Sequence, residues 1–162
     1  MDARGSISEE GFTLVELVVV IVLIGILAMV AGPRFVGREA FDARGYADGF
    51  LGALQYARQQ AVAMRRTVCF TAQAGGYMLT SGQAPGDACA VAVASPDGSG
   101  DYAMMAPDAV GIAGHAGTAL PHTVIFSPLG RPNNAATFRV QGDTDRCISV
   151  EAETGYVRYV TC

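Results

Sequence analysis

The 162-residue sequence predicts an α+β protein, in which a long N-terminal helix, with its first half transmembrane, packs on a small antiparallel β-sheet head. Three observations predict this fold. An apolar run begins at Phe12, apolar residues then recur at helical spacing to about residue 66, and short β-branched segments alternate with glycine-rich turns after that. The expected parts are a leader at 1–11, a transmembrane half-helix at 12–33, an amphipathic half-helix at 34–66 and a β-rich head at 67–162.

Composition limits the classes of protein that fit. Hydrophobic residues make up 51% of the chain and charged residues 16%, which excludes intrinsic disorder. The formal net charge is -4, and every basic residue is Arg. Residues 67–162 carry four Arg against eight acidic residues, so the head does not offer the broad basic surface that phosphate backbones require.

The first element is the apolar run from Phe12 to Ala31, twenty residues with one charge. A helix of that length spans roughly 30 Å, which is the thickness of a bilayer core. A cleaved secretory signal is the competing interpretation, but it requires a basic start and a shorter apolar stretch. Because residues 1–11 are net acidic, we expect the run to remain in the chain as a membrane helix.

Glu16 is the single charge in this run. A carboxylate in a membrane helix is costly near the centre and less so at an interface, so the simplest interpretation is an interfacial Glu. A second interpretation pairs it with an amine. If the chain is cut after Gly11, Phe12 becomes the N-terminus, and Glu16 lies one helical turn along on the same face. The free amine and the carboxylate can then pair either within one chain or between neighbouring chains.

The segment Gly11-Phe12-Thr13-Leu14-Val15-Glu16, followed by the apolar run, resembles the prepilin motif of type IV pilins and type II secretion pseudopilins. The resemblance implies that a prepilin peptidase cuts between Gly11 and Phe12 and methylates Phe12. It also implies that Glu16 registers the subunit in a growing filament at the inner membrane assembly platform. Glu10 departs from the family, which usually has Lys or Arg at this position.

Pro33 interrupts the helix pattern. Proline removes a backbone donor, so the simplest interpretation is a helix end, whereas the resemblance implies a kink within a longer helix. The recurrence of apolar residues to Met64 favours the kink and predicts a helix to about Arg66, with its apolar stripe against the head. Arg58, on this helix, is most simply a solvated charge.

The head is expected to be a set of short strands. We expect strands at 67–71 and 77–80 around a turn, at 91–93, at 124–126 and 136–140 around the turn 127–130, and at 147–150 and 156–160 in a final hairpin. Residues 95–121 show no firm period and are expected to form a loop.

Four cysteines allow three pairings. Their spacing contains no CxxC, which disfavours zinc or thioredoxin-like chemistry, and a head outside the inner membrane lies in an oxidising space. A two-residue turn at Thr154-Gly155 places Cys147 opposite Cys162. We therefore predict Cys147–Cys162 and, by remainder, Cys69–Cys89, although a register slip of one residue would undermine the first pair.

No catalytic constellation is present. His115 and His122 lack Cys or carboxylate neighbours at metal-ligand spacing, and Ser127 lacks the G-x-S-x-G context of a nucleophile. We expect no enzymatic activity, no cofactor and no metal ion.

The head also resembles the minor subunits grouped as pseudopilin H and fimbrial T proteins. The resemblance is carried by segments 54–61, 126–130 and 154–158 and by the strand at Cys69. Together with Pro33-Arg34-Phe35, it is nearest to minor pilins of MSHA-type adhesive pili. It implies a minor pilin or pseudopilin that contributes to filament initiation or to the tip.

The implied location is the inner membrane, with a single crossing and a periplasmic head, and later the pilus or pseudopilus. The implied partners are other pilin subunits, the prepilin peptidase, the assembly platform and the lipid bilayer. The alternative function is DNA binding for natural transformation, in which Arg158 is a possible DNA contact. Nucleic acid is a partner only in that alternative.

Overall fold

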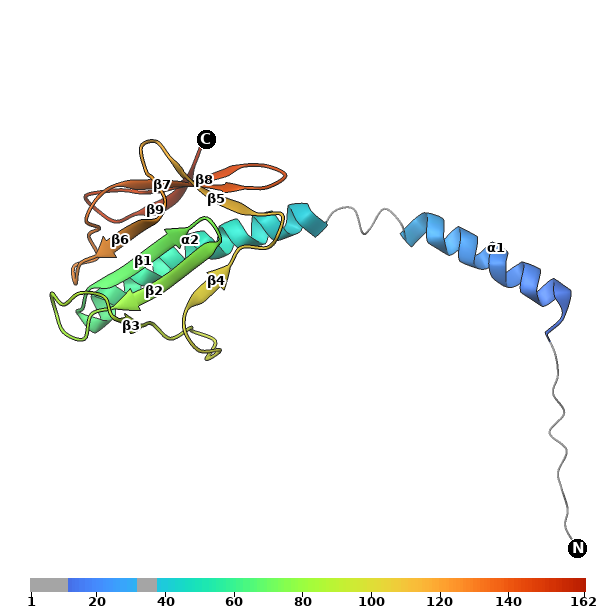
Figure 1. The fold of residues 1–162 in the computed structure, drawn as a ribbon, viewed down its shortest axis with the longest axis horizontal. Helices are drawn as coiled ribbons and strands as arrows, with labels where there is room; N and C mark the ends of the chain where they lie inside the picture. Colours follow the sequence, from blue (N-terminus) through green and yellow to red (C-terminus); the bar gives the residue numbers. More distant parts are fainter. Residues whose placement is uncertain (1–11, 32–37) are drawn as a thin grey trace, which may run out of the picture. The chain divides into compact units, whose positions relative to one another are not determined.

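The computed structural model describes residues 12–31 and 38–162, which belong to two compact units, 1–37 and 38–162 (Figure 1). The expected leader at 1–11, with the cleavage residue Gly11, and the expected kink at Pro33 lie outside the described residues.

The first unit contains helix α1, Leu14–Ala31. Thr13 caps its start, because the Glu16 backbone N–H donates to the Thr13 hydroxyl oxygen at 3.2 Å. The large apolar side chains described between Phe12 and Leu27 are 44–82% exposed. By length and apolar character together, no helix among the described residues qualifies as a membrane span.

The second unit is built on helix α2, Arg38–Met64. Its buried side chains recur at helical spacing and are mostly small: Ala43, Tyr46, Ala47, Phe50, Ala53, Leu54, Ala57 and Ala61. The small alanines let the helix approach both sheets of the head closely, so the predicted packing of a helix on antiparallel sheet is confirmed. The helix ends two residues earlier than expected.

A Schellman motif ends α2. Arg65 has a left-handed φ of 50°, and the Arg66 N–H donates to the Ala61 carbonyl at 3.2 Å while the Arg65 N–H donates to the Val62 carbonyl at 3.3 Å. These bonds satisfy carbonyls that the end of a helix otherwise leaves unpaired. Arg65 occupies a position that glycine usually takes, which is why the sequence did not indicate the end.

The first sheet is antiparallel and has the order β3-β2-β1-β6, with β4 pairing with another part of β2. Its strands are β1 Val68–Gln73, β2 Gly76–Ser81, β3 Val91–Ala92, β4 Ala103–Met105 and β6 His122–Phe126. The second sheet is also antiparallel, with the order β5-β7-β8-β9. Its strands are β5 Gly111–His115, β7 Ala136–Gln141, β8 Arg146–Val150 and β9 Val157–Val160.

The core lies where α2 meets the two sheets. Phe50 of α2 is fully buried, and its ring centroid is 4.9 Å from that of Phe70 on β1 and 5.3 Å from that of Phe138 on β7. Both contacts are edge-to-face, an arrangement that aromatic rings favour. One helical side chain therefore joins all three layers.

The expectation of a loop at 95–121 is wrong, because this segment contains β4 and β5. Both strands take their hydrogen-bond partners from far away, β4 from β2 and β5 from β7. Neither strand alternates apolar with polar residues, since β4 is Ala-Met-Met, all exposed, and β5 is Gly-Ile-Ala-Gly-His. Tertiary pairing, rather than local propensity, makes these residues strands.

The strands flanking the turn at 127–130 belong to different sheets. The Ser127 N–H donates to the Arg131 carbonyl at 2.8 Å, and Phe126 forms a bridge with Pro132. The chain thus folds back briefly on β6 before it crosses to the second sheet. The turn therefore leads from one sheet to the other and does not pair β6 with β7.

The structure contains the disulfides Cys69–Cys89 and Cys147–Cys162, which are the pairs expected from the sequence. The register used to reach the second pair is wrong, because Cys147 faces Val160 and not Cys162. The turn is longer than two residues, since the Gly155 N–H donates to the Glu151 carbonyl at 2.9 Å. The observed register differs by two residues from the expected one. A shift of two keeps Cys162 on the same face of the hairpin, diagonally next to Cys147, so the pair still forms.

Candidate functional site

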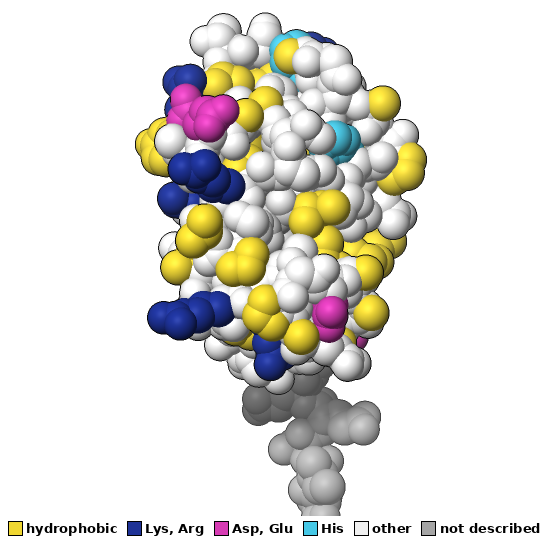
Figure 2. Space-filling model, turned by 90° about the vertical axis from the view of Figure 1, so that its left-hand side faces the viewer, with side chains coloured by type: hydrophobic (Ala, Val, Ile, Leu, Met, Phe, Trp, Pro, Cys, Tyr) yellow, Lys and Arg dark blue, Asp and Glu magenta, His cyan; other side chains and the backbone are white. Residues whose placement is uncertain are grey.

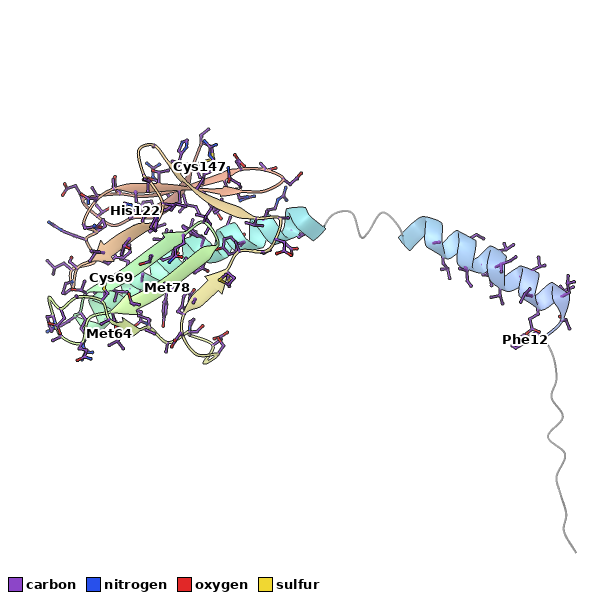
Figure 3. The ribbon with its side chains drawn as sticks, viewed as in Figure 1. Phe12, Met64, Cys69, Met78, His122 and Cys147 are labelled. Carbon is purple, nitrogen blue, oxygen red and sulfur yellow. A yellow bond between two sulfur atoms is a disulfide. The ribbon has the colours of Figure 1, made fainter. Side chains whose placement is uncertain are left out.

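The start of α1 holds two of the residues predicted to act in assembly. Phe12 is 82% exposed and lies two residues before the first residue of α1, at the end of the described segment (Figure 3). Glu16 is exposed in the first helical turn, where a negative charge is favoured by the helix dipole. Residues 12–31 contain no other charged side chain, so this segment provides no ion partner for the Glu16 carboxylate.

The structure also assembles a site around Arg58, which the sequence indicated only as a solvated charge. Arg58 lies on α2, and its Nε donates to the Gly130 carbonyl at 3.3 Å, across 72 residues of sequence. Gly130 and Gly155 are both buried and both left-handed, with φ of 77° and 65°. The side chain therefore lies between turns that come from two different sheets.

Both glycines are required by the contact with Arg58. A Cβ atom on Gly130 would lie 3.0 Å from the Val62 Cγ2 and 3.4 Å from the Arg58 Nε. A Cβ on Gly155 would lie 3.3 Å from the same Nε and would collide with the Gly130 carbonyl. Left-handed φ and close approach together exclude any side chain at either position without a shift.

Three distant segments thus meet at one point. They are 54–61 on α2, 126–130 after β6 and 154–158 at the start of β9, the segments on which the resemblance to pseudopilin H rests. Sequence reasoning missed their meeting because no local pattern links an arginine to two remote glycines. The only indication in the sequence was that Arg58, Gly130 and Gly155 all lie in segments that carry the resemblance to pseudopilin H.

A cleft of about 270 Å³ opens beside this junction. It is lined by Gln55, Arg58 and Gln59 of α2 and by Gly155, Tyr156 and Val157 of the last hairpin. Gln55 and Gln59 are exposed and Arg58 is half-buried. The cleft therefore combines one cation with neutral hydrogen-bonding groups and an aromatic ring.

Arginine side chains gather at one end of the head. Figure 2 views that end and shows them along one side of the face, with hydrophobic and acidic side chains among them. Arg158, the possible DNA contact, is exposed on β9 opposite Ser149. Arg131 is exposed in the turn after β6.

The two histidines lie apart on different strands and different sheets. His115 on β5 is 2.9 Å from Arg139 Nη2 through its Nδ1. His122 on β6 packs its ring 5.8 Å from that of Phe138. Across residues 12–31 and 38–162, no group of three or more His, Cys, Asp or Glu is placed to hold a metal ion.

A hydrogen-bonded tyrosine fastens the second sheet to α2. The Tyr159 hydroxyl donates to the Asp48 carboxylate at 2.5 Å, and the Arg146 guanidinium lies 5.5 Å from the centre of the Tyr159 ring. Burial, together with this bond to Asp48, raises the pKa of Tyr159 to about 12. The contact anchors β9 near the middle of α2.

Comparison with known families gives two matches. The family described as type II transport protein GspH matches residues 46–155, and the prokaryotic N-terminal methylation motif matches residues 8–32. The first match contains the whole Arg58 junction, and the second contains Gly11, Phe12 and Glu16. No curated protein matches the chain significantly.

Solved structures share the fold. The type IV minor pilin FimU of Pseudomonas aeruginosa has a TM-score of 0.54 and 19% identity, covering 76% of this chain and 91% of FimU. A second crystal form of FimU has a TM-score of 0.51 and 18% identity, covering 73% and 92%. The minor pseudopilin EpsH of the Vibrio cholerae type 2 secretion system has a TM-score of 0.58 and 11% identity, covering 74% and 96%.

Proposed function

The chain belongs to the GspH family of type II transport proteins, and from that premise we propose that it is a minor subunit of a type IV pilus or a type II secretion filament. The observation that carries the proposal is the presence of two features in one chain. A methylation motif covers the start of α1, and a GspH head follows it. The proposed role is structural rather than catalytic, at filament initiation or at the tip.

The proposal assigns roles to three residues at the N-terminus. A prepilin peptidase cuts between Gly11 and Phe12, and Phe12 is then N-methylated. Glu16 pairs with the new amine of Phe12 in a neighbouring subunit. The physical support is that a carboxylate surrounded by apolar residues is stabilised by a nearby cation, and the N-terminal amine is the group that cleavage would supply.

The same proposal places residues 12–33 in the inner membrane and the head in the periplasm. The exposed large apolar side chains of α1 support an environment of lipid before assembly and of other subunits' helices afterwards. The two disulfides suit an oxidising compartment. The proposed partners are the bilayer, the peptidase, the assembly platform and other pilin subunits.

The test is Gly11→Ala in cells that make the filament. We expect the wild-type chain to lose residues 1–11 and to carry a methylated Phe12, both measured by mass spectrometry, and to be recovered in sheared filaments. Gly11→Ala should stay full-length and be missing from filaments. An uncleaved chain found in filaments at the wild-type level would contradict the processing step.

Glu16→Gln separates assembly from processing. This change keeps the shape of the side chain and removes its charge, so cleavage after Gly11 should proceed while recovery in filaments falls. Glu9→Gln, in the expected leader, removes one carboxylate from a segment that is discarded and should leave recovery unchanged. Recovery of Glu16→Gln in filaments at the wild-type level would contradict the proposed pairing of Glu16 with the Phe12 amine.

A further inference from the structure

We propose that the cleft beside Arg58 binds an Asp or Glu carboxylate of a neighbouring subunit in the same filament. The inference rests on the proposed filament role and goes beyond it, because it names a contact surface on the head. Gln55, Arg58 and Gln59 form its floor along α2, and Tyr156 forms one wall.

Arg58 is held in place before any partner arrives. Its Nε is used by the Gly130 carbonyl, and Gly130 and Gly155 flank its side chain. This bond leaves the two Nη groups to donate in parallel, which is the geometry that a carboxylate accepts. A guanidinium that is already fixed loses less conformational entropy on binding, so the contact is stronger than that of a mobile arginine.

Arg58 has no counter-ion within the head. Among the described residues of the chain the single ion pair joins Arg139 to Asp145, at 3.6 Å. Arg58 is half-buried, and a partly desolvated cation without a partner is a favourable place for an anion. Gln55 and Gln59 lie four residues apart on α2, and their amides can donate hydrogen bonds to the same anion.

The surroundings favour a protein partner over a phosphate backbone. Arg58 is the cation that lines the cleft, and the exposed Arg131 and Arg158, next in sequence to Gly130 and Val157, are offset in charge by Glu151 and Glu153 on the adjoining hairpin. Neutralising a nucleic acid requires several cations along its path, so this arrangement suits it poorly. A single acidic side chain needs only one.

Exposed apolar side chains adjoin the junction. Val62 is 49% exposed, Leu129 80% and Tyr156 54%. The Val62 Cγ2 lies 3.0 Å from where a Cβ on Gly130 would be, and the other two residues neighbour Gly130 and Gly155 in sequence. Protein interfaces favour arginine and tyrosine at their centres with apolar contacts around them. Another subunit presenting a carboxylate among apolar residues is therefore the occupant that this surface fits.

The test is Gln59→Glu in the full chain, produced in cells that assemble the filament. The new carboxylate would lie in the same cleft, offset the positive charge of Arg58 and repel the partner's carboxylate, while the Nε bond and the glycines are left unchanged. We expect recovery in sheared filaments to fall by at least about tenfold, with normal cleavage after Gly11. Gln73→Glu makes the same charge change at the exposed end of β1 and should not alter recovery.

A photo-cross-linking residue at position 55 identifies the occupant. We expect it to cross-link to a filament subunit near an Asp or Glu, and changing that residue to Lys should restore recovery of Gln59→Glu. Wild-type recovery of Gln59→Glu, or cross-linking to nucleic acid instead of a subunit, would overturn the inference and leave the filament role intact. Absence of the wild-type chain from filaments would instead overturn both.

Discussion

The two helices follow each other in the sequence but differ in the exposure of their apolar side chains. In α1 large side chains such as Leu17 and Leu27 are 61% and 67% exposed. In α2 the stripe that includes Phe50 and Leu54 is buried, and most positions between its members are polar or exposed, with Leu51 half-buried against the core. The chain therefore contains one helix, α2, that buries its apolar stripe within its own unit, and one, α1, that is apolar on every face.

The difference shows how pattern, rather than total hydrophobicity, selects a partner. Because α1 is apolar on every face, a single sheet could cover only part of its apolar surface. Burying all of it requires apolar surroundings on every side, as lipid or a helical bundle provides. Burying one such side chain is worth about 1.5–3 kcal/mol. The alanines of α2 instead permit close contact with the sheets, so α2 stabilises the fold, and assembly is the role proposed for α1.

The largest expected effect comes from Phe50→Ala. Phe50 contacts Phe70 and Phe138 and is fully buried, so its loss leaves a cavity where α2 and both sheets meet. We expect the free energy of unfolding of the head to fall by about 3–5 kcal/mol. Urea denaturation of the full chain in detergent, followed by near-ultraviolet circular dichroism, measures the change.

Leu23→Ala in α1 is the matched control. Leu23 is 53% exposed, and its truncation should change the head's unfolding by less than about 0.5 kcal/mol. If Leu23→Ala destabilised the head as much as Phe50→Ala, the division of roles between the helices would be wrong.

A smaller effect is expected from Gly155→Ala. Its φ of 65° disfavours alanine, and the new Cβ would press on the Arg58 side chain and on the Gly130 carbonyl. We expect a loss of about 1–2 kcal/mol or more in the same urea experiment. Gly52→Ala is the control, because a Cβ there meets nothing within 4 Å in the middle of α2. Gly52→Ala should raise the free energy of unfolding by up to about 1 kcal/mol. Equal effects of the two changes would contradict the close packing of Gly155 against Arg58.

The elements that could be predicted are those whose cause is local. The buried stripe of α2 and the strands of the β8–β9 hairpin follow from residue spacing within one segment. β4 could not be predicted, because Ala103–Met105 carries no alternation and is a strand only through pairing with β2. Segment composition contains no information about such a partner.

The Arg58 junction was missed for the same physical reason. Its hydrogen bond spans 72 residues, and it forms only when two sheets are in place around α2. An arginine on a helix is usually solvated, and a turn glycine usually reflects only its own φ. By contrast, Phe12 and Glu16 stand together in one short motif, so the assembly end of the chain could be proposed from sequence.

The smallest expected effect is that of Tyr159→Phe, which removes the hydroxyl that donates to Asp48 and joins β9 to α2. Tyr159 is 37% exposed, so the change should cost about 0.5–1.5 kcal/mol at neutral pH, as expected for one hydrogen bond. Tyr156→Phe is the control, because Tyr156 is 54% exposed and the change should leave stability unaltered.

The same substitution should change how stability depends on alkaline pH. Burial and the Asp48 contact raise the pKa of Tyr159 to about 12 in the folded head, whereas an unfolded tyrosine titrates near 10. Between these values the unfolded chain has lost the proton that the folded chain retains, so stability is lost as pH rises from about 10 to 12. Burial raises the pKa of Tyr46 to about 12 as well, so Tyr159→Phe should make this decline shallower without abolishing it. Urea midpoints measured at pH 8, 10 and 11 test this, and an unchanged slope would mean that the Asp48 contact does not raise the pKa of Tyr159. Because α1 contains no tyrosine, the decline arises within residues 38–162.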